Sequence, residues 1–231
     1  MKDIITHLEK IRKLERKRLH PLIHEVHKKH KISKKTLLYV KEYGPHSHAL
    51  RTIIRESIKI LLLASLISSF GGLALEHVKL VFVSILPLVI LLPTLNDMLG
   101  DYGTIISSRF STMLHEGKIK SDPSKNKEMI KMYKQILAVA MLTGIFSASI
   151  ALLISTHSGY EATPEIILKI LLIIAADIII IVSLLFLIAV NVGWRMHKKE
   201  EDPNNFLIPI TTSLADFGNM VILFVLISMF F

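Results

Sequence analysis

The stretch Ile210-Thr-Thr-Ser-Leu-Ala-Asp-Phe-Gly-Asn-Met220 places one aspartate near the middle of an otherwise apolar segment. Asp216 is the single ionisable side chain between Phe206 and Phe231. A segment of this length and apolarity is typical of a helix that crosses a bilayer. A carboxylate in hydrocarbon costs roughly 2.5–3.5 kcal/mol on insertion scales, so such residues face a bundle interior or a water-filled cavity. The stretch therefore predicts a helical membrane protein in which Asp216 has a function.

The rest of the chain follows the same pattern, because long apolar runs alternate with short, Lys-rich connectors along its 231 residues. Five membrane spans are expected, over residues 53–75, 80–112, 136–155, 166–190 and 206–231. The second is expected to be one long helix, kinked or broken around Pro93, whose polar half faces protein or water rather than lipid. The predicted fold class is an all-α, polytopic membrane protein with five transmembrane helices.

The positive charge is concentrated before the first span. Residues 1–52 hold 14 Lys and Arg against 5 Asp and Glu, which accounts for the whole formal charge of +9. We expect residues 1–50 to form a basic, helical, cytoplasmic arm in contact with anionic lipid, and residues 51–231 to form a five-helix transmembrane domain. A nucleic-acid partner is disfavoured, since a basic segment next to a span is explained by the positive-inside rule.

The connectors agree with this orientation. Residues 115–134 and 194–205 carry an excess of Lys and Arg, whereas residues 76–79 and 156–165 do not. For five spans, this alternation predicts a cytoplasmic N-terminus and an external C-terminus.

Four acids lie inside the expected spans, and amides and hydroxyls accompany them. These acids are Asp97, Asp101, Asp177 and Asp216, with Asn96 and Asn219 among their polar neighbours. The chain has no cysteine, so thiolate metal sites are excluded. Oxygen ligands suit a hard cation such as Mg²⁺, which keeps several waters and takes one or two carboxylates directly. The simplest alternatives are that an embedded acid is protonated, or that another helix brings Arg109 to Asp97 or Asp101.

Three segments resemble one family of transporters. Residues 202–216, Asp-Pro-Asn-Asn-Phe-Leu-Ile-Pro-Ile-Thr-Thr-Ser-Leu-Ala-Asp, resemble the last-helix signature of the MgtE and solute-carrier-41 magnesium transporters. Residues 100–112, Gly-Asp-Tyr-Gly-Thr-Ile-Ile-Ser-Ser-Arg-Phe-Ser-Thr, resemble the second-helix segment of the solute-carrier-41 branch. The segment from Arg55-Glu-Ser57 through Gly71-Gly72 to Glu76 is similar to that branch too. The resemblance covers about residues 50–231, as a single five-helix unit without the cytoplasmic N and CBS domains of bacterial MgtE.

This resemblance implies a homodimeric Mg²⁺ channel or transporter in the plasma membrane, with its pore at the dimer axis between the second and fifth helices. It gives Asp216 and the backbone carbonyl of Thr212 the role of binding hydrated Mg²⁺. The Gly-Asn pattern of the MgtE second helix is replaced here by Asn96-Asp97 and Gly100-Asp101.

The predicted site follows from these residues. The expected metal-site residues are Asp216, Thr212, Asp101, Asp97 and Asn96. Possible ion-coupling or pore-lining residues are Asp177, Asn219, Ser213 and Glu76. No organic cofactor and no enzymatic activity are expected, since no catalytic His/Asp or Ser/Lys pattern lies in the spans. The alternative is a proton- or sodium-coupled secondary transporter that uses the same embedded aspartates.

Overall fold

The computed structural model describes residues 21–30, 37, 49–119, 126–198 and 203–231, and within these ranges the regular structure is helical throughout. The chain divides into two compact units, Met1–Lys59 and Ile60–Phe231. The first unit contains α2 (Pro21–His30). A helix with a break at Pro21 is predicted over residues 3–30, and α2 covers the described part of that range. The rest of that prediction lies outside the described residues, and the division at residue 50 stays a prediction.

The first two expected spans correspond to α4 (Ala49–His77), α5 (Lys79–Ser84) and α6 (Leu86–His115). The chain is not broken at Pro93, because α6 continues through it, and a kink there stays a prediction. The chain leaves helical geometry instead at Ile85, with φ −102° and ψ 77°. The cause is Pro87, which lies in the first turn of α6. A proline there has no N–H to donate and its ring clashes with the carbonyl one turn earlier, so the preceding helix ends.

The last three spans correspond to α7 (Lys127–His157), α8 (Pro164–Lys198) and α9 (Pro203–Phe230). These helices extend beyond the predicted apolar segments into the charged connectors. α7, for example, begins nine residues before the predicted span at 136, where the Asn126 side chain accepts hydrogen bonds from the backbone N–H groups of Glu128 (2.9 Å) and Met129 (3.4 Å). This is an N-cap, which satisfies donors that the first helical turn leaves free.

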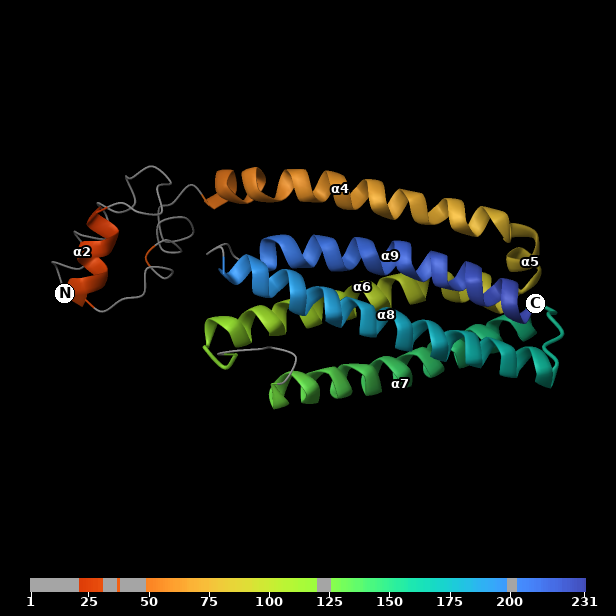
Figure 1. Cartoon of the computed structure of the whole chain (residues 1–231). Coiled ribbons are helices and arrows are strands. Elements are labelled where there is room, and N and C mark those ends of the chain that lie inside the picture. The colour runs from red at the N-terminus through yellow and green to blue at the C-terminus, as the bar shows by residue number, and fades with distance from the viewer. Residues whose placement is uncertain (1–20, 31–36, 38–48, 120–125, 199–202) are drawn as a thin grey trace. The chain divides into compact units, whose positions relative to one another are not determined.

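Helix α6 runs through the middle of the second unit and packs against α5, α7, α8 and α9 (Figure 1). Its inner side carries fully buried residues that include Leu95, Leu99 and Phe110. The buried side of α7 is formed largely by small residues, and Ala140, Gly144 and Ala148 lie on it at a four-residue spacing. Small residues let membrane helices pack closely, and the large side chains of α7 are left to face outward.

Within the described residues, four helices are long and apolar enough to cross a membrane. They are Ile58–His77, Lys127–His157, Pro164–His197 and Phe206–Phe230. α6 is not one of them, because polar residues that include Asp97 and Asp101 interrupt its apolar sequence. The protein is therefore an integral membrane protein built from helices, and the fifth span stays a prediction.

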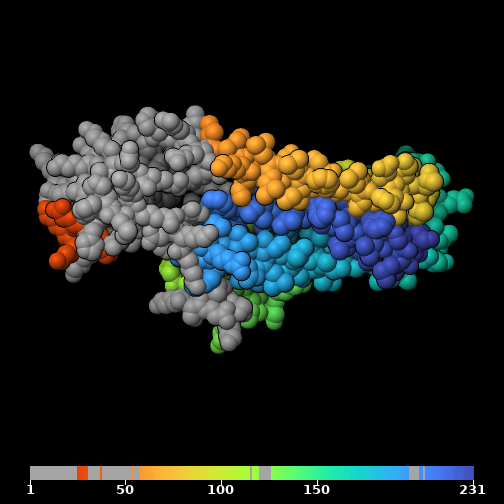
Figure 2. All heavy atoms as spheres, turned by 45° about the horizontal axis from the view of Figure 1, so that its top comes forward, coloured from red at the N-terminus to blue at the C-terminus, as the bar shows by residue number. Residues whose placement is uncertain are grey.

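Over residues 60–77, α4 lies along α9 and most of its surface is exposed (Figure 2). Leu62, Leu66 and Phe70 are each more than half exposed. The contact with α9 is close at Gly71, where an added Cβ would lie 2.8 Å from Sδ of Met220 and 3.2 Å from Cα of Phe217. An apolar outer side of this kind suits contact with lipid chains.

Candidate functional site

Asp216 lies in the middle of α9 on the side that α4 covers. Its carboxylate is half-buried, and the hydroxyl of Ser68 in α4 donates a hydrogen bond of 3.3 Å to Oδ2. One oxygen therefore has a neutral donor beside it, and no cation compensates its charge within the described chain. Such a carboxylate is available to a cation that reaches this side of α9.

The residues just before Asp216 present oxygen atoms along the same helix. The hydroxyl of Thr212 donates to the carbonyl oxygens of Ile208 (2.9 Å) and Pro209 (3.2 Å), and that of Ser213 donates to Ile210 (3.1 Å). Because each hydroxyl uses its proton in these bonds, the lone pairs of its oxygen remain as acceptors. Thr212 is half-buried, whereas Ser213 is buried. α9 can thus offer neutral oxygen ligands one turn from its carboxylate.

Helices α6 and α9 are joined by two polar contacts. Ser107 and Thr211 share a hydrogen bond of 3.0 Å between their hydroxyls, and both side chains are fully buried. Farther along the seam, the Asn219 amide donates to Oδ1 of Asn96. The amide oxygen of Asn219 is buried without a hydrogen-bond partner. The structure thus brings together Asn96 and Asn219, two residues that the sequence nominated separately.

The opposite side of α6 is exposed and polar along its length. Its exposed polar residues are Thr94, Asp97, Asp101, Ser108, Arg109 and Thr112, and together they form the outer polar face of α6. Their spacing of three, four and seven residues keeps them on one side of the helix. Arg109 makes no ion pair with Asp97 or Asp101 in the described chain, so the alternative in which it pairs with one of these acids is not seen. Neither acid has a described contact with Asp216.

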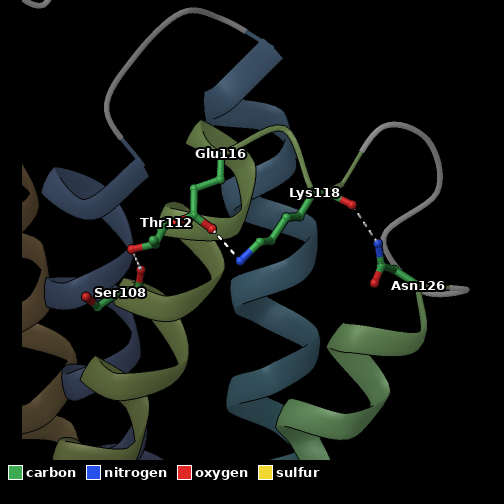
Figure 3. A network of polar contacts seen from close by, with 5 residues as sticks. All are labelled: Ser108, Thr112, Glu116, Lys118 and Asn126. Atoms are coloured by element: carbon green, nitrogen blue, oxygen red, sulfur yellow. Dashed lines mark hydrogen bonds and ion pairs between the residues drawn. The ribbon is translucent and has the colours of Figure 1, made fainter.

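A network of polar contacts lies where the outer polar face of α6 ends (Figure 3). The Thr112 hydroxyl donates to the carbonyl of Ser108 (3.0 Å), and Nζ of Lys118 forms an ion pair of 2.7 Å with Glu116. The Asn126 amide, at the start of α7, donates to the carbonyl of Lys118 (3.0 Å). The hydrogen bond and charge of Glu116 raise the pKa of Lys118 above its usual range. These contacts fix the connection between α6 and α7.

Two further predicted residues lie apart from this group. Asp177 is fully buried on α8, and both of its carboxyl oxygens lack a hydrogen-bond partner. Glu76 is predicted to lie in a loop, but it belongs to the last turn of α4, where it is exposed and forms an ion pair of 3.6 Å with Lys79. No group of three or more His, Asp or Glu side chains able to hold a metal is found in the described parts of the chain.

Sequence reasoning missed the partners of the nominated residues. Ser68 was not singled out, nor were the pairing of Ser107 with Thr211 and the hydrogen bond of 2.8 Å between Tyr102 and Thr143. Ser68 and Asp216 are 148 positions apart, and a lone serine in an apolar helix carries no signal of its own. Such pairs become visible once the helices are assembled.

A family model described as a divalent cation transporter, MgtE, matches residues 92–226, which is more than half of the chain and includes most of α6 and α9. The chain belongs to the MgtE family. This membership places the chain among transporters rather than enzymes, and divalent cations are the cargo of its family.

This MgtE-family chain is similar to curated proteins of the solute carrier 41 group. It is 27% identical to solute carrier family 41 member 2 of Macaca fascicularis over 186 residues, which cover 73% of this chain and 31% of that protein. It is 26% identical to the human member 2, with the same coverage of this chain and of that protein. Mouse member 3 gives 26% identity over 174 residues, 74% of this chain and 35% of that protein. The chain thus spans about a third of these relatives, and no solved structure gives a significant match.

Proposed function

We propose that this chain transports Mg²⁺, with related divalent cations, along a path between α6 and α9 of two identical subunits. The observation that carries the proposal is the outer polar face of α6. Acids and hydroxyls at the depth of the bilayer face water, a cavity or another protein surface rather than lipid. In the single subunit nothing described covers this face, and a second copy of the chain would enclose it.

Symmetry supports this arrangement. In a two-fold dimer the same surface of each subunit meets its own copy, so a face that carries acids on one subunit becomes a path lined by acids on both sides. Asp216 and Thr212 are half-buried on α9, the helix that packs against α6. The path would therefore combine acids from α6 with the carboxylate of α9.

The proposed ligands bind the ion mainly through its water shell. Mg²⁺ releases water reluctantly and takes one or two carboxylates directly. Asp216 and the carbonyl of Thr212 would form the central site, and Asp101, Asp97 and Asn96 would attract the hydrated ion on its way. Several weak sites permit both entry and exit, which conduction requires. Ser213 and Asn219 are buried beside this path and would shape it rather than touch the ion.

The proposed setting is the plasma membrane, with the N-terminus in the cytoplasm. Several described basic residues lie at the end of the second unit where α6 ends and α7 begins, and they include Arg109, Lys118, Lys127 and Lys131. The positive-inside rule makes this the cytoplasmic end. The basic arm would lie on the same side and contact anionic lipid.

The test is Mg²⁺ flux into proteoliposomes, reported by a trapped Mg²⁺ dye, for wild type and Asp216→Asn. The substitution keeps the shape of the side chain and removes its charge. The matched control is Glu161→Gln, which removes an exposed acid from the connection between α7 and α8. We expect flux in the wild type and the control and none in Asp216→Asn, with all three proteins folded and dimeric. Equal flux in all three would remove Asp216 from the path.

The same vesicles distinguish a channel from a coupled transporter that uses these aspartates. Flux through a channel would saturate as the Mg²⁺ concentration rises and would not depend on gradients of other ions. Dependence of the flux on an imposed pH or Na⁺ gradient would favour coupling.

A further inference from the structure

Asp177 is the most deeply buried acid among the described residues of the bundle. Its side chain has no exposed surface, and neither carboxyl oxygen has a hydrogen-bond partner. Its surroundings are closely packed. The next residue, Ile178, presses on Gly144 of α7, and Ile181, one turn farther, lies 2.9 Å from where a Cβ on Gly218 of α9 would be. Asp177 therefore occupies a seam that α7 and α9 close around α8.

A metal ion does not fit this position. Hard cations take several oxygen ligands, and Mg²⁺ demands near-octahedral geometry. Both oxygens of Asp177 are free of described polar neighbours, and its neighbours in the sequence are Ala176 and Ile178. A lone carboxyl in apolar surroundings offers too few ligands to replace the water shell of a cation.

An ionised carboxylate does not fit either, because no positive charge among the described residues faces it. On α6, Asp97, Asp101 and Arg109 lie on the outer polar face, and Tyr102 bonds to Thr143. On α7, Tyr133 bonds to Ser183 of α8, and the charged residues lie near the ends of the helix. On α9, Asp216 accepts its hydrogen bond from α4. On α8 itself, Lys169 pairs with Glu165 at 2.8 Å, two turns from Asp177. A buried charge with no partner is the costliest arrangement available to an acid.

We propose that Asp177 is a proton-binding site, neutral when the seam is closed, and that its proton is exchanged as the cation moves. This inference rests on the proposed function. A buried acid of this kind is typical of a proton relay within a membrane. The ligand is a proton because it is the one cation that a single carboxyl oxygen can bind without further ligands.

Helix α9 provides the physical link between the two sites. Asp216 lies on the side of α9 that α4 covers, and Gly218, two residues along, closes on α8. A displacement of α9 that opens the path at Asp216 also loosens the seam over Asp177. Water then reaches the carboxyl, and the proton leaves to water on the side from which Mg²⁺ enters. The carboxylate takes up another proton from water on the opposite side before the seam closes. Each subunit contributes one such acid, so a dimer exchanges as many positive charges as one Mg²⁺ carries.

Infrared spectroscopy tests the proton site without any transport. A protonated carboxylic acid has a carbonyl-stretch band that a carboxylate lacks. We expect this band at neutral pH in reconstituted wild type, its loss in Asp177→Asn, and its presence in the control Glu161→Gln. Identical spectra for wild type and Asp177→Asn would overturn the proposal. If Asp177→Asn does not fold, Asp177→Glu carries the test, since the band must then shift in frequency and an unshifted band refutes the assignment.

Coupling is measured in proteoliposomes with dyes for Mg²⁺ and pH trapped inside. We expect an inward Mg²⁺ gradient to drive protons outward in the wild type, and the ratio of proton to Mg²⁺ flux to fall at least tenfold in Asp177→Asn. An unchanged ratio, or wild-type Mg²⁺ flux with no proton movement, would refute coupling. Absence of Mg²⁺ flux from every variant would instead refute the proposed function, and the infrared band would still decide the proton site.

Discussion

Ser68 of α4 donates a hydrogen bond of 3.3 Å to the Asp216 carboxylate of α9, which is the one described polar contact that α4 makes with the candidate site. The bond fixes the orientation of the carboxylate. It also joins a helix with a largely exposed surface to the helix that carries the proposed central ligand.

Ser68→Ala is expected to weaken Mg²⁺ transport without abolishing it. Loss of one hydrogen bond costs about 1 kcal/mol, so we expect the Mg²⁺ concentration for half-maximal flux to rise roughly fivefold. Flux titrations in proteoliposomes measure this change. Ser69→Ala is the matched control, because Ser69 is exposed and its hydroxyl bonds to Ser65 in the same helix. An equal effect of both substitutions would contradict a specific role for Ser68.

Asp101→Asn and Asp97→Asn are expected to lower flux at subsaturating Mg²⁺ by about three- to tenfold each. Acids lining a path raise the local concentration of cations, and focusing of this kind changes association rates by 10–10³ overall. The loss should shrink at high ionic strength, since salt screens exposed charges. Initial rates at low and high salt provide the measurement. A loss that is independent of salt would show a structural effect instead.

Ile105→Cys is expected to form a disulfide between two subunits under mild oxidation. Ile105 is 40% exposed and lies within the outer polar face of α6, the proposed dimer axis, where a residue meets its own copy. The chain has no cysteine, so no native residue can form a competing disulfide. Non-reducing gel electrophoresis of native membranes detects the product. Leu142→Cys on α7, 70% exposed at a predicted lipid-facing position, should stay monomeric, and cross-linking at both positions to the same extent would contradict the proposed axis.

Gly103→Ala is expected to destabilise the bundle by about 1–3 kcal/mol, the usual effect of overpacking. An added Cβ would lie 3.2 Å from Cβ and 3.3 Å from Oγ1 of Thr211, and it would strain the hydrogen bond between Thr211 and Ser107. Thermal unfolding in detergent measures the loss. Gly100→Ala, where an added Cβ meets nothing within 4 Å, should be neutral or stabilising. A lower melting temperature for Gly100→Ala than for Gly103→Ala would refute the packing argument.

Glu116→Gln is expected to lower the pKa of Lys118 toward the usual value for lysine. The Glu116 carboxylate favours the charged ammonium, so the ion pair contributes fully below the pKa of the unfolded chain and is lost as pH rises through the raised folded pKa. NMR titration of a labelled lysine follows this change. Glu128→Gln should lower the pKa less, because Glu128 acts through charge alone and is the smaller contributor. A larger effect at Glu128 would contradict the described ion pair.

Local features of the sequence predicted the helices. Apolar runs marked the membrane segments, and Pro203 marked the start of α9 through its preference for the first helical turn. The sequence also predicts that the side chain of Asp202 caps this helix, but Asp202 lies outside the described residues. The break was predicted around Pro93 rather than at Ile85 because α6 contains two prolines, Pro87 and Pro93, and the pattern alone does not say which of them a long helix tolerates.

The sequence also nominated the acids, because an ionisable residue in an apolar run is costly wherever the chain places it. It could not rank them by environment. Asp97, Asp101 and Asp177 look alike as isolated acids, yet the first two are exposed on α6 and the third is fully buried on α8.

By itself the sequence determined that this is a helical membrane protein with acids inside its spans, because helix formation and membrane insertion depend on neighbouring residues along the chain. Tertiary structure decided which acid meets Ser68, which pair of amides joins α6 to α9, and which carboxyl is buried without a described partner. The physical reason is that burial and hydrogen bonding at each acid are set by helices distant in sequence. Their side chains come together when the bundle packs.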